Sequence, residues 1–279
     1  MPMDGYLGRI LCVDLSSEEL RDEPLDPEFV RDYMGGSGLA AAFLAREDIA
    51  AIDPLGPGNP LVWMTGPLVG TAMPSAGRIS VCAISPLTGI WGEANTGGSL
   101  GPRLRFAGYD GIVVTGRAER PVWLSIIDGT ATLHEADELR GLDTYATQDS
   151  VRERLASNQV SVACIGEAGE RGVRYASIMN DHGRAAGRCG LGAVMGSKNL
   201  KALAVAGRAE VPVADSKTLS DVVKAVLQHT EEDIAAQAIW MAGTPGCLDM
   251  ALMYGDLPIR SFGQGERAEA GNLSGVRLT

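Results

Sequence analysis

Arginines beside closely spaced glycines are the residues of this sequence best suited to chemistry. They occur in Gly77-Arg78, in residues 95–98 (NTGG) and in residues 183–188 (GRAAGR). Successive glycines let neighbouring backbone N–H groups turn toward one anion, and an arginine adds a planar fork of donors that fits a phosphate. A single loop of this kind is more often a tight turn with a solvent-facing arginine. Two related loops favour a bound anionic ligand.

An internal repeat relates two of these segments. The heptapeptides GRAERPV and GRAEVPV match at six of seven positions, 91 residues apart. The glycine-rich segments before them align at an offset of 90, which pairs Asn95 with Ala185 and Gly97 with Gly187. Each is interpreted as a glycine-rich loop that feeds an apolar strand. We expect a pseudo-two-fold β domain in which the two equivalent loops face one ligand.

Other motifs fail the test of their context. Residues 36–41 (GSGLAA) mimic a dinucleotide fingerprint, but a helix is expected before them, so a helix–helix turn is favoured. The sequence has no P-loop, no H-E-x-x-H zinc motif and no G-x-S-x-G elbow. Residues 180–184 (NDHGR) form the densest polar cluster, within which Asp181 and His182 are the candidates for a proton relay. A hydrogen-bonded turn is favoured there over a proton relay.

The elements that must carry these loops follow from the apolar patterning. Short apolar runs between glycine, proline and serine predict strands at residues 8–15, 19–24, 61–64, 79–84, 111–114, 122–127, 160–165 and 203–205. Helical spacing and capping residues predict helices at residues 26–34, 39–47 and 143–156, and again from 216 to 253. We therefore expect an α+β fold, with a β-rich domain over residues 1–210 and the start of an α-helical domain over 211–279.

Composition narrows the class of function. The net charge is −11, which argues against nucleic acid as a partner.

The five cysteines are widely spaced and form no C-x-x-C pair, so small buried thiols in a reducing cytoplasm are favoured over disulfides or a metal knuckle. The N-terminal residues lack the pattern of an export signal, and no apolar run is long enough to span a bilayer.

Several segments, in order along the chain, resemble the tungsten-dependent aldehyde:ferredoxin oxidoreductases. The resemblance covers residues 5 to about 210 and continues more weakly to 258. Its motifs are residues 6–15 (YLGRILCVDL), 66–68 (GPL), 74–78 (PSAGR), 85–89 (SPLTG), 106–111 (FAGYDG), 178–188 (IMNDHGRAAGR) and 190–200 (GLGAVMGSKNL). The resemblance implies that the first domain is a base of two β-sheets on which a bis-pterin tungsten cofactor sits.

The same resemblance assigns site residues. Arg78, Gly97, Arg184 and Gly187 would contact the pterins. Asn95 and Ala185 would offer backbone carbonyls to a Mg²⁺ ion that bridges the two pterin phosphates, in keeping with the way magnesium binds cofactor phosphates through few protein ligands. No catalytic acid or base is identified in this chain. Tungsten or molybdenum remain alternatives for the redox metal.

The sequence departs from the family in one respect. Family members hold a [4Fe–4S] cluster with a C-x-x-C-x-x-x-C run and a later cysteine, and this sequence has no such run. The chain is therefore expected to need the rest of the enzyme, or a partner subunit, for the cluster.

The expected function is that of the N-terminal part of an enzyme that oxidises aldehydes to carboxylates and passes electrons to ferredoxin. The alternatives are a tungstopterin subunit of a complex such as an aryl-CoA reductase, a catalytically silent cofactor-binding module, and a β scaffold without cofactor. A cytoplasmic location without membrane contact is expected, and the oligomeric state, including a homodimer, stays open.

Overall fold

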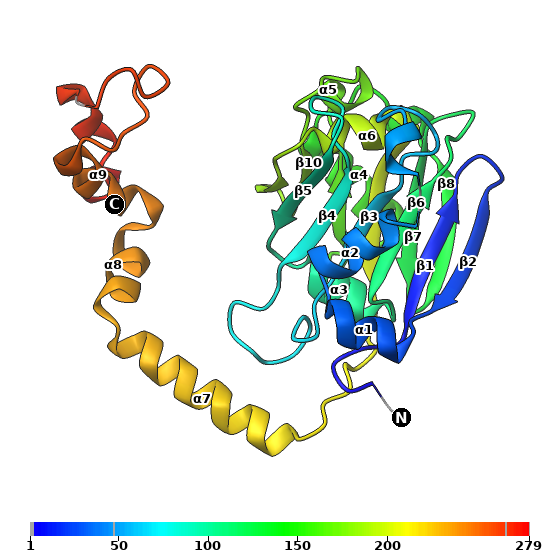
Figure 1. The fold of residues 1–279 in the computed structure, drawn as a ribbon, viewed down its shortest axis with the longest axis horizontal. Coiled ribbons are helices and arrows are strands. Elements are labelled where there is room, and N and C mark those ends of the chain that lie inside the picture. The colour runs from blue at the N-terminus through cyan, green and yellow to red at the C-terminus, as the bar shows by residue number, and fades with distance from the viewer. Residues whose placement is uncertain (1–2, 47, 266, 279) are drawn as a thin grey trace. The chain divides into compact units, whose positions relative to one another are not determined.

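The computed structural model describes residues 3–46, 48–265 and 267–278. The chain divides into two compact units, Met1–Asp215 and Ser216–Thr279. The first unit is built on two six-stranded sheets and the second is helical (Figure 1). The expected α+β fold with two β-sheets is confirmed.

The first sheet has the strand order β2-β1-β6-β3-β4-β5. These strands are β1 (Arg9–Asp14), β2 (Glu19–Pro24), β3 (Leu61–Met64), β4 (Ile79–Ile84), β5 (Trp91–Thr96) and β6 (Gly111–Thr115). β1 and β6 are parallel, and the other neighbours are antiparallel. β5 therefore forms one edge of this sheet.

The second sheet repeats this topology. Its strands are β7 (Val122–Ile127), β8 (Thr130–Glu135), β9 (Ser161–Cys164), β10 (Ile178–Asn180), β11 (Arg184–Ala186) and β12 (Leu200–Ala206). The order β8-β7-β12-β9-β10-β11 matches the first sheet strand for strand, and β7 and β12 are again the parallel pair. The short sequence repeat thus marks a pseudo-two-fold arrangement of the whole unit. β11, the equivalent of β5, forms the matching edge.

Helices cover the outer face of each sheet. Around the first sheet lie α1 (Pro27–Tyr33), α2 (Ser37–Leu44) and a 3₁₀ turn at Ile49–Ala51, and around the second lie a 3₁₀ turn at Asp137–Leu139, α4 (Thr144–Arg154) and α5 (Glu167–Glu170). Phe43 and Leu44 of α2 pack on Val62 and Met64 of the first sheet. Val151 of α4 joins a similar cluster on the second. Two helix layers therefore flank the two sheets.

The main core lies between the sheets. It joins side chains from both inner faces with those of α3 (Leu100–Phe106) and α6 (Leu191–Ser197). α3 follows β5 of the first sheet but contacts β9 and β12 of the second, whereas α6 follows β11 and contacts both sheets, through β10 and β12 of its own and β3 and β4 of the first. At the offset of 91, α3 and α6 align residue for residue. The two halves of the unit, each a sheet with its helices, therefore share one core.

Several elements differ from the sequence prediction. The segments around Asn95 and Arg184 are strands β5 and β11, not loops. β5 was missed because Gly92, Ala94 and Thr96 face inward, so small residues replace the apolar alternation of an ordinary strand. β8, β10, α3, α5 and α6 were also missed, since each is short or rich in polar residues or glycine. The expected turn at Gly36 does join α1 to α2.

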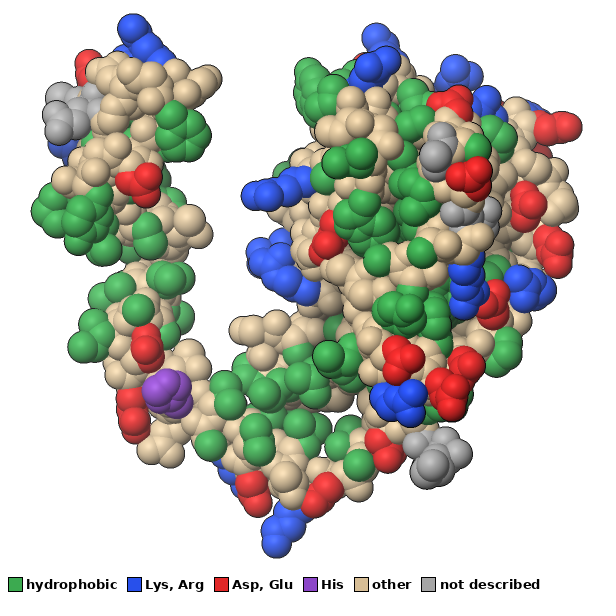
Figure 2. Space-filling model, viewed as in Figure 1, with side chains coloured by type: hydrophobic (Ala, Val, Ile, Leu, Met, Phe, Trp, Pro, Cys, Tyr) green, Lys and Arg blue, Asp and Glu red, His purple; other side chains and the backbone are tan. Residues whose placement is uncertain are grey.

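The second unit contains α7 (Ser216–Glu232), α8 (Ile234–Ala242), a 3₁₀ turn at Thr244–Cys247, α9 (Leu248–Tyr254), a second 3₁₀ turn at Ala268–Leu273 and α10 (Gly275–Leu278). Figure 2 shows hydrophobic side chains gathered on the surface of α8 and α9, where Ile234, Trp240 and Met253 are among the exposed residues. This unit is helical, as the spacing of apolar residues from 216 onward predicts. No helix among the described residues is long and apolar enough to cross a bilayer.

Candidate functional site

The two equivalent edge strands, β5 and β11, lie beside each other although they belong to different sheets. An open cavity of about 690 Å³ lies along both strands. Four of the residues predicted for the site line it: Arg78, Asn95, Ala185 and Gly187. The two related segments therefore face one open space, and the expected ligand in that space stays a prediction.

The remaining two predicted residues flank the cavity without lining it. Gly97 follows β5, and its carbonyl accepts a hydrogen bond from Asn180 Nδ2 at 3.0 Å. Arg184 begins β11, and its aliphatic stem lies next to Gly98. Gly97 follows Asn95 by two residues and Arg184 directly precedes Ala185, and both Asn95 and Ala185 line the cavity. The structure thus gathers all six residues around the meeting of the two edges.

Three further lining residues, Glu93, Ala94 and Arg188, were not predicted. Glu93 Oε1 accepts hydrogen bonds from Ser37 Oγ and from Asn95 Nδ2, the latter at 2.7 Å. Asn95 Oδ1 in turn accepts from Ser80 Oγ at 3.3 Å. The period of two along β5 would have placed Glu93 beside Asn95, had the strand been identified.

The electrostatics of the cavity suit an anionic ligand. Arg78, Arg184 and Arg188 are exposed, and none makes an ion pair or side-chain hydrogen bond within the described part of the chain. A guanidinium held near a concave surface without a carboxylate partner remains available to a phosphate. Glu93 is the one acidic residue among the lining side chains described, and its carboxylate is engaged by Ser37 and Asn95.

The glycines of the cavity leave room for a ligand to approach the backbone. A Cβ added at Gly97 would meet no atom within 4 Å, and at Gly187 the nearest atoms lie 3.8 Å away. Both positions therefore face open space instead of packed protein. Gly77 differs, because a Cβ there would contact the carbonyl of Gly98 at 3.4 Å. Gly77, next to Arg78, therefore packs closely against the backbone of the segment that follows β5.

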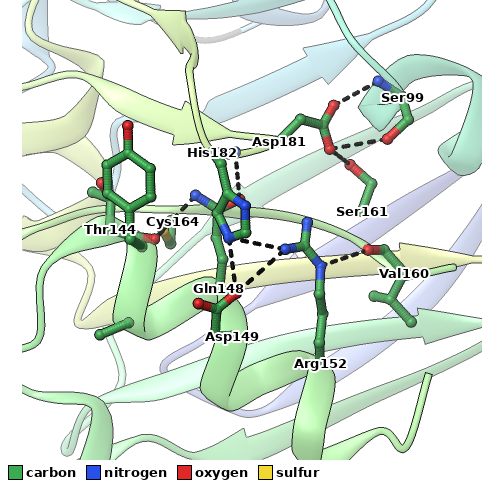
Figure 3. A network of polar contacts seen from close by, with 12 residues as sticks. Ser99, Thr144, Gln148, Asp149, Arg152, Val160, Ser161, Cys164, Asp181 and His182 are labelled. Carbon is green, nitrogen blue, oxygen red and sulfur yellow. Dashed lines mark hydrogen bonds and ion pairs between the residues drawn. The ribbon is translucent and has the colours of Figure 1, made fainter. Parts of the chain in front are cut away.

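Asp181 and His182 form a turn, and no hydrogen bond joins them. The Asp181 carboxylate accepts from Ser99 and Ser161, whereas His182 Nε2 lies 2.8 Å from Asp149 Oδ1 (Figure 3). Both residues have positive φ angles, which is typical of a tight turn. The favoured interpretation as a hydrogen-bonded turn is confirmed.

The cysteines only partly follow the prediction of buried thiols. Cys82 and Cys164 are buried, Cys12 and Cys189 are partly exposed, and Cys247 is exposed, so the prediction was wrong for the last of these. Burial raises the pKa of the Cys164 thiol to about 12 and that of Cys12 to about 11. Within the described residues, no group of three or more His, Cys, Asp or Glu side chains gathers as for a metal ion.

Comparisons with known proteins show the family to which the chain belongs. Residues 10–207 match the family described as aldehyde ferredoxin oxidoreductase, N-terminal domain. The chain is 41% identical over 277 residues to the tungsten-containing aldehyde ferredoxin oxidoreductase of Pyrococcus furiosus, and 40% identical over 278 residues to that of Thermococcus kodakarensis. Each alignment covers 99% of this chain and 46% of the relative, so the chain spans about half the length of these relatives.

Two other relatives carry different names. The aliphatic sulfonate oxidoreductase, WOR-like subunit, of Pyrococcus furiosus is 35% identical over 226 residues, 75% of this chain and 36% of the relative. Among solved structures, the active-site complex BamBC of benzoyl coenzyme A reductase, in complex with 1,5-dienoyl-CoA, matches with a TM-score of 0.80 and 32% identity. That match covers 82% of this chain and 35% of the other.

Proposed function

Because this chain belongs to the aldehyde ferredoxin oxidoreductase family, whose N-terminal domain it matches, we propose that it forms the base of a bis-pterin tungsten site. In the complete protein this site would oxidise aldehydes to carboxylates and deliver electrons to ferredoxin. The observation that carries the proposal is the meeting of the two pseudo-symmetric edge strands at one cavity flanked by unpaired arginines. A pseudo-symmetric surface suits a cofactor that itself has two equivalent halves.

The residues present fit such a cofactor. A volume of about 690 Å³ lies within the range of small-molecule sites. Arg78, Arg184 and Arg188 would neutralise the pterin phosphates, and the open backbone at Gly97 and Gly187 would let the pterins approach. When bound, tungsten on the pterin dithiolenes supplies the two-electron redox chemistry.

A magnesium ion belongs to the same proposal. Asn95 and Ala185 are exposed residues of edge strands, and an edge strand leaves part of its backbone carbonyls without a ladder partner. Such carbonyls are hard oxygen ligands, which suit Mg²⁺ that keeps most of its shell as water and phosphate. Glu93 holds the Asn95 side chain and thereby fixes the strand segment that would offer the carbonyl.

The [4Fe–4S] cluster, ferredoxin and the aldehyde would engage other parts of the enzyme or a partner subunit. No residue of this chain is proposed to ligate the cluster, and the acid and base groups of the reaction would come from those other parts as well. Five cysteines without a disulfide among the described residues fit a cytoplasmic location.

The test is the tungsten and pterin content of the purified protein. We expect elemental analysis of the wild-type protein to find tungsten, and Arg184→Ala and Arg78→Ala to lower that content about tenfold, as loss of one charge-assisted contact predicts. Arg171→Ala is the control, because Arg171 is exposed and pairs with Glu167 outside the cavity. A full tungsten content in both cavity variants would contradict the site.

A second candidate keeps the cofactor and changes the substrate. The structural similarity to the BamBC complex of benzoyl coenzyme A reductase favours a tungsten subunit of an aryl-CoA reductase complex. The complete protein should be assayed with aldehydes and with aryl-CoA thioesters, with ferredoxin as electron carrier. Turnover of aldehydes alone would favour the first candidate, and turnover of the thioester alone would favour the second.

A further inference from the structure

The turn between β10 and β11 reaches from the second half of the unit to the first. Asn180 is fully buried and uses both ends of its amide there. Its Oδ1 accepts from Thr96 Oγ1 at 2.6 Å, and its Nδ2 donates to the Gly97 carbonyl at 3.0 Å. Thr96 and Gly97 belong to the end of β5 and the residue after it. One side chain therefore connects the two edge strands.

Asp181 makes a second connection. Its carboxylate accepts from the Ser99 backbone N–H at 2.6 Å and from Ser99 Oγ at 2.9 Å, both in the first half (Figure 3). It also accepts from Ser161 Oγ at 2.9 Å, in the second half. Hydrogen bonds to a carboxylate are about twice as strong as neutral ones. Asp181 therefore joins β9 of one sheet to the start of α3 in the other half.

The backbone is shaped to permit these contacts. Asp181 and His182 have φ angles of 46° and 56°, and Gly98 has a φ of 86°. A Cβ at Gly98 would overlap the Asp181 carboxylate, so the space that glycine leaves is the space that the carboxylate occupies. Left-handed backbone at residues with a side chain persists where the surroundings enforce it.

The far side of the turn is fixed as well. The His182 backbone N–H donates to Gln148 Oε1 at 3.1 Å, and the ring nitrogen Nε2 lies 3.0 Å from Arg152 Nη1 (Figure 3). Gln148 and Arg152 belong to α4, which packs on the outer face of the second sheet. The turn is thus anchored to the second half and holds the first through Asn180 and Asp181.

These contacts matter because no described backbone ladder pairs β5 with β11. The two strands are edges of separate sheets, so side-chain hydrogen bonds add to the shared core in holding the two sides of the cavity together. We propose that Asn180 and Asp181, here called the clamp, are positioning residues that set the separation of these two sides for the cofactor. The proposal rests on the proposed function, because it concerns how that same cavity is held to the spacing of two pterins.

A matched pair of serines tests the clamp. Ser99 and Ser161 each donate to the same Asp181 oxygen at 2.9 Å, but only the Ser99 bond crosses between the halves. In the holoenzyme, Ser99→Ala should speed pterin release about fivefold, by loss of one hydrogen bond. Ser161→Ala should release pterin at the wild-type rate. Release is followed by the fluorescence of free pterin after dilution.

Asp181→Asn should have a larger effect, because it removes the charge and reverses part of the bonding pattern. We expect tungsten and pterin content to fall about tenfold, and the tungsten(V) electron paramagnetic resonance signal of the remaining loaded protein to change shape. Asp181→Glu, which restores the charge on a longer stem, should recover part of the content. A purely structural role would lower the yield of folded protein but leave the signal unchanged.

The outcomes separate the two proposals. If wild-type protein contains neither tungsten nor pterin, the proposed function fails. If wild-type protein is loaded, and Ser99→Ala releases pterin no faster than Ser161→Ala, the clamp is overturned while the proposed function stands. The serine pair also keeps the test decisive if Asp181→Asn does not fold, since each serine variant removes a single hydroxyl.

Discussion

The two halves of the first unit share one topology but differ in the hairpin that carries the edge strand. In the first half, β4 and β5 have six residues each, and the turn between them exposes Leu87 and Ile90. In the second half, β10 and β11 have three residues each, and the polar residues Asn180 and Asp181 lie at the end of β10 and the start of the turn. Ile90 stands where the offset of 91 would place Asp181. The two strands that line the cavity are therefore equivalent, whereas the turn between β10 and β11 that connects them has no polar equivalent in the described part of the first half.

The buried charges of the two halves differ in a similar way. Asp110 aligns with Lys201 at the offset of 91. Asp110 pairs with buried Arg105 and accepts the backbone N–H groups of Leu7, Gly8 and Arg9. Lys201 pairs instead with Glu170. Equivalent positions thus carry opposite charges because their neighbours differ. Asp110 accepts backbone N–H groups of the N-terminal segment, whereas Lys201 contacts a carboxylate and a backbone carbonyl.

Breaking the Asp110 site should have the largest effect. Asp110→Ala leaves the Arg105 guanidinium buried without its partner, so we expect a loss of about 3–5 kcal/mol in the free energy of unfolding. Glu170→Ala in the other half should lose about 1–3 kcal/mol, because Lys201 keeps the Leu142 carbonyl at 2.9 Å and Glu170 is partly exposed. Urea denaturation of both variants measures the difference. Equal losses would contradict this comparison of the halves.

Gly98→Ala should have the next largest effect, about 2–3 kcal/mol, because an alanine is strained at a φ of 86° and would displace the Asp181 carboxylate. Gly183→Ala, on the other side of the clamp, is the matched control. A Cβ at Gly183 meets no atom within 4 Å, so a change within about 0.5 kcal/mol is expected. Thermal denaturation compares the two variants, and similar midpoints would argue against close packing at Gly98.

Lys198 should make stability depend on pH. Its ammonium is buried, with Nζ 3.0 Å from the Pro57 carbonyl, and burial together with the charge of Arg117 lowers the pKa to about 7 from an ordinary value of 10.5. Between these values the unfolded chain holds a proton that the folded chain lacks. The free energy of unfolding should therefore rise with pH, by up to about 1.4 kcal/mol per pH unit.

Lys198→Met should flatten this rise between pH 7 and about 8.5. Other groups change stability outside this window. Burial lowers the pKa of His134, so the effect of His134 on stability occurs at lower pH. Burial raises the pKa of the Cys12 and Cys164 thiols, which lowers the free energy of unfolding only as pH passes about 9. Urea denaturation at several pH values measures both proteins. If the free energy of unfolding rises equally with pH in both proteins, Lys198 is not the source of the rise.

The helix caps should show the smallest difference. Asp143 accepts the backbone N–H groups of Tyr145 and Ala146 at the start of α4, whereas Asp26 accepts only that of Glu28 at the start of α1. Asp143→Ala should lower the free energy of unfolding by about 1–2 kcal/mol and Asp26→Ala by about 0.5–1 kcal/mol. Thermal denaturation resolves this order, and a larger loss for Asp26→Ala would reverse it.

Much of the fold could be predicted because it depends on local patterns. β3, β4, β6 and β7 carry predominantly apolar runs, and α1 and α4 begin after capping aspartates, so their positions follow from neighbouring residues alone. β5 and β11 could not be predicted in this way. Their strand conformation comes from pairing with β4 and β10, since their own residues are small or polar.

The candidate site likewise contains residues that the sequence indicates and residues that only the structure reveals. Glycine spacing, the short repeat and the family motifs are enough to select six positions from the sequence: Arg78, Asn95, Gly97, Arg184, Ala185 and Gly187. Glu93 required the strand geometry, because its place at the cavity depends on which face of β5 it occupies.

By itself, then, the sequence determined the repeat and the family, and the resemblance to that family implied the base of two β-sheets, because motifs and their order are read directly from the chain. Only the tertiary structure decided that the two edge strands meet, and that Asn180 and Asp181 join them. The physical reason is that the residues in these contacts lie more than 80 positions apart in the chain. Hydrogen bonds of that range exist only after the two sheets and the helices between them have packed together.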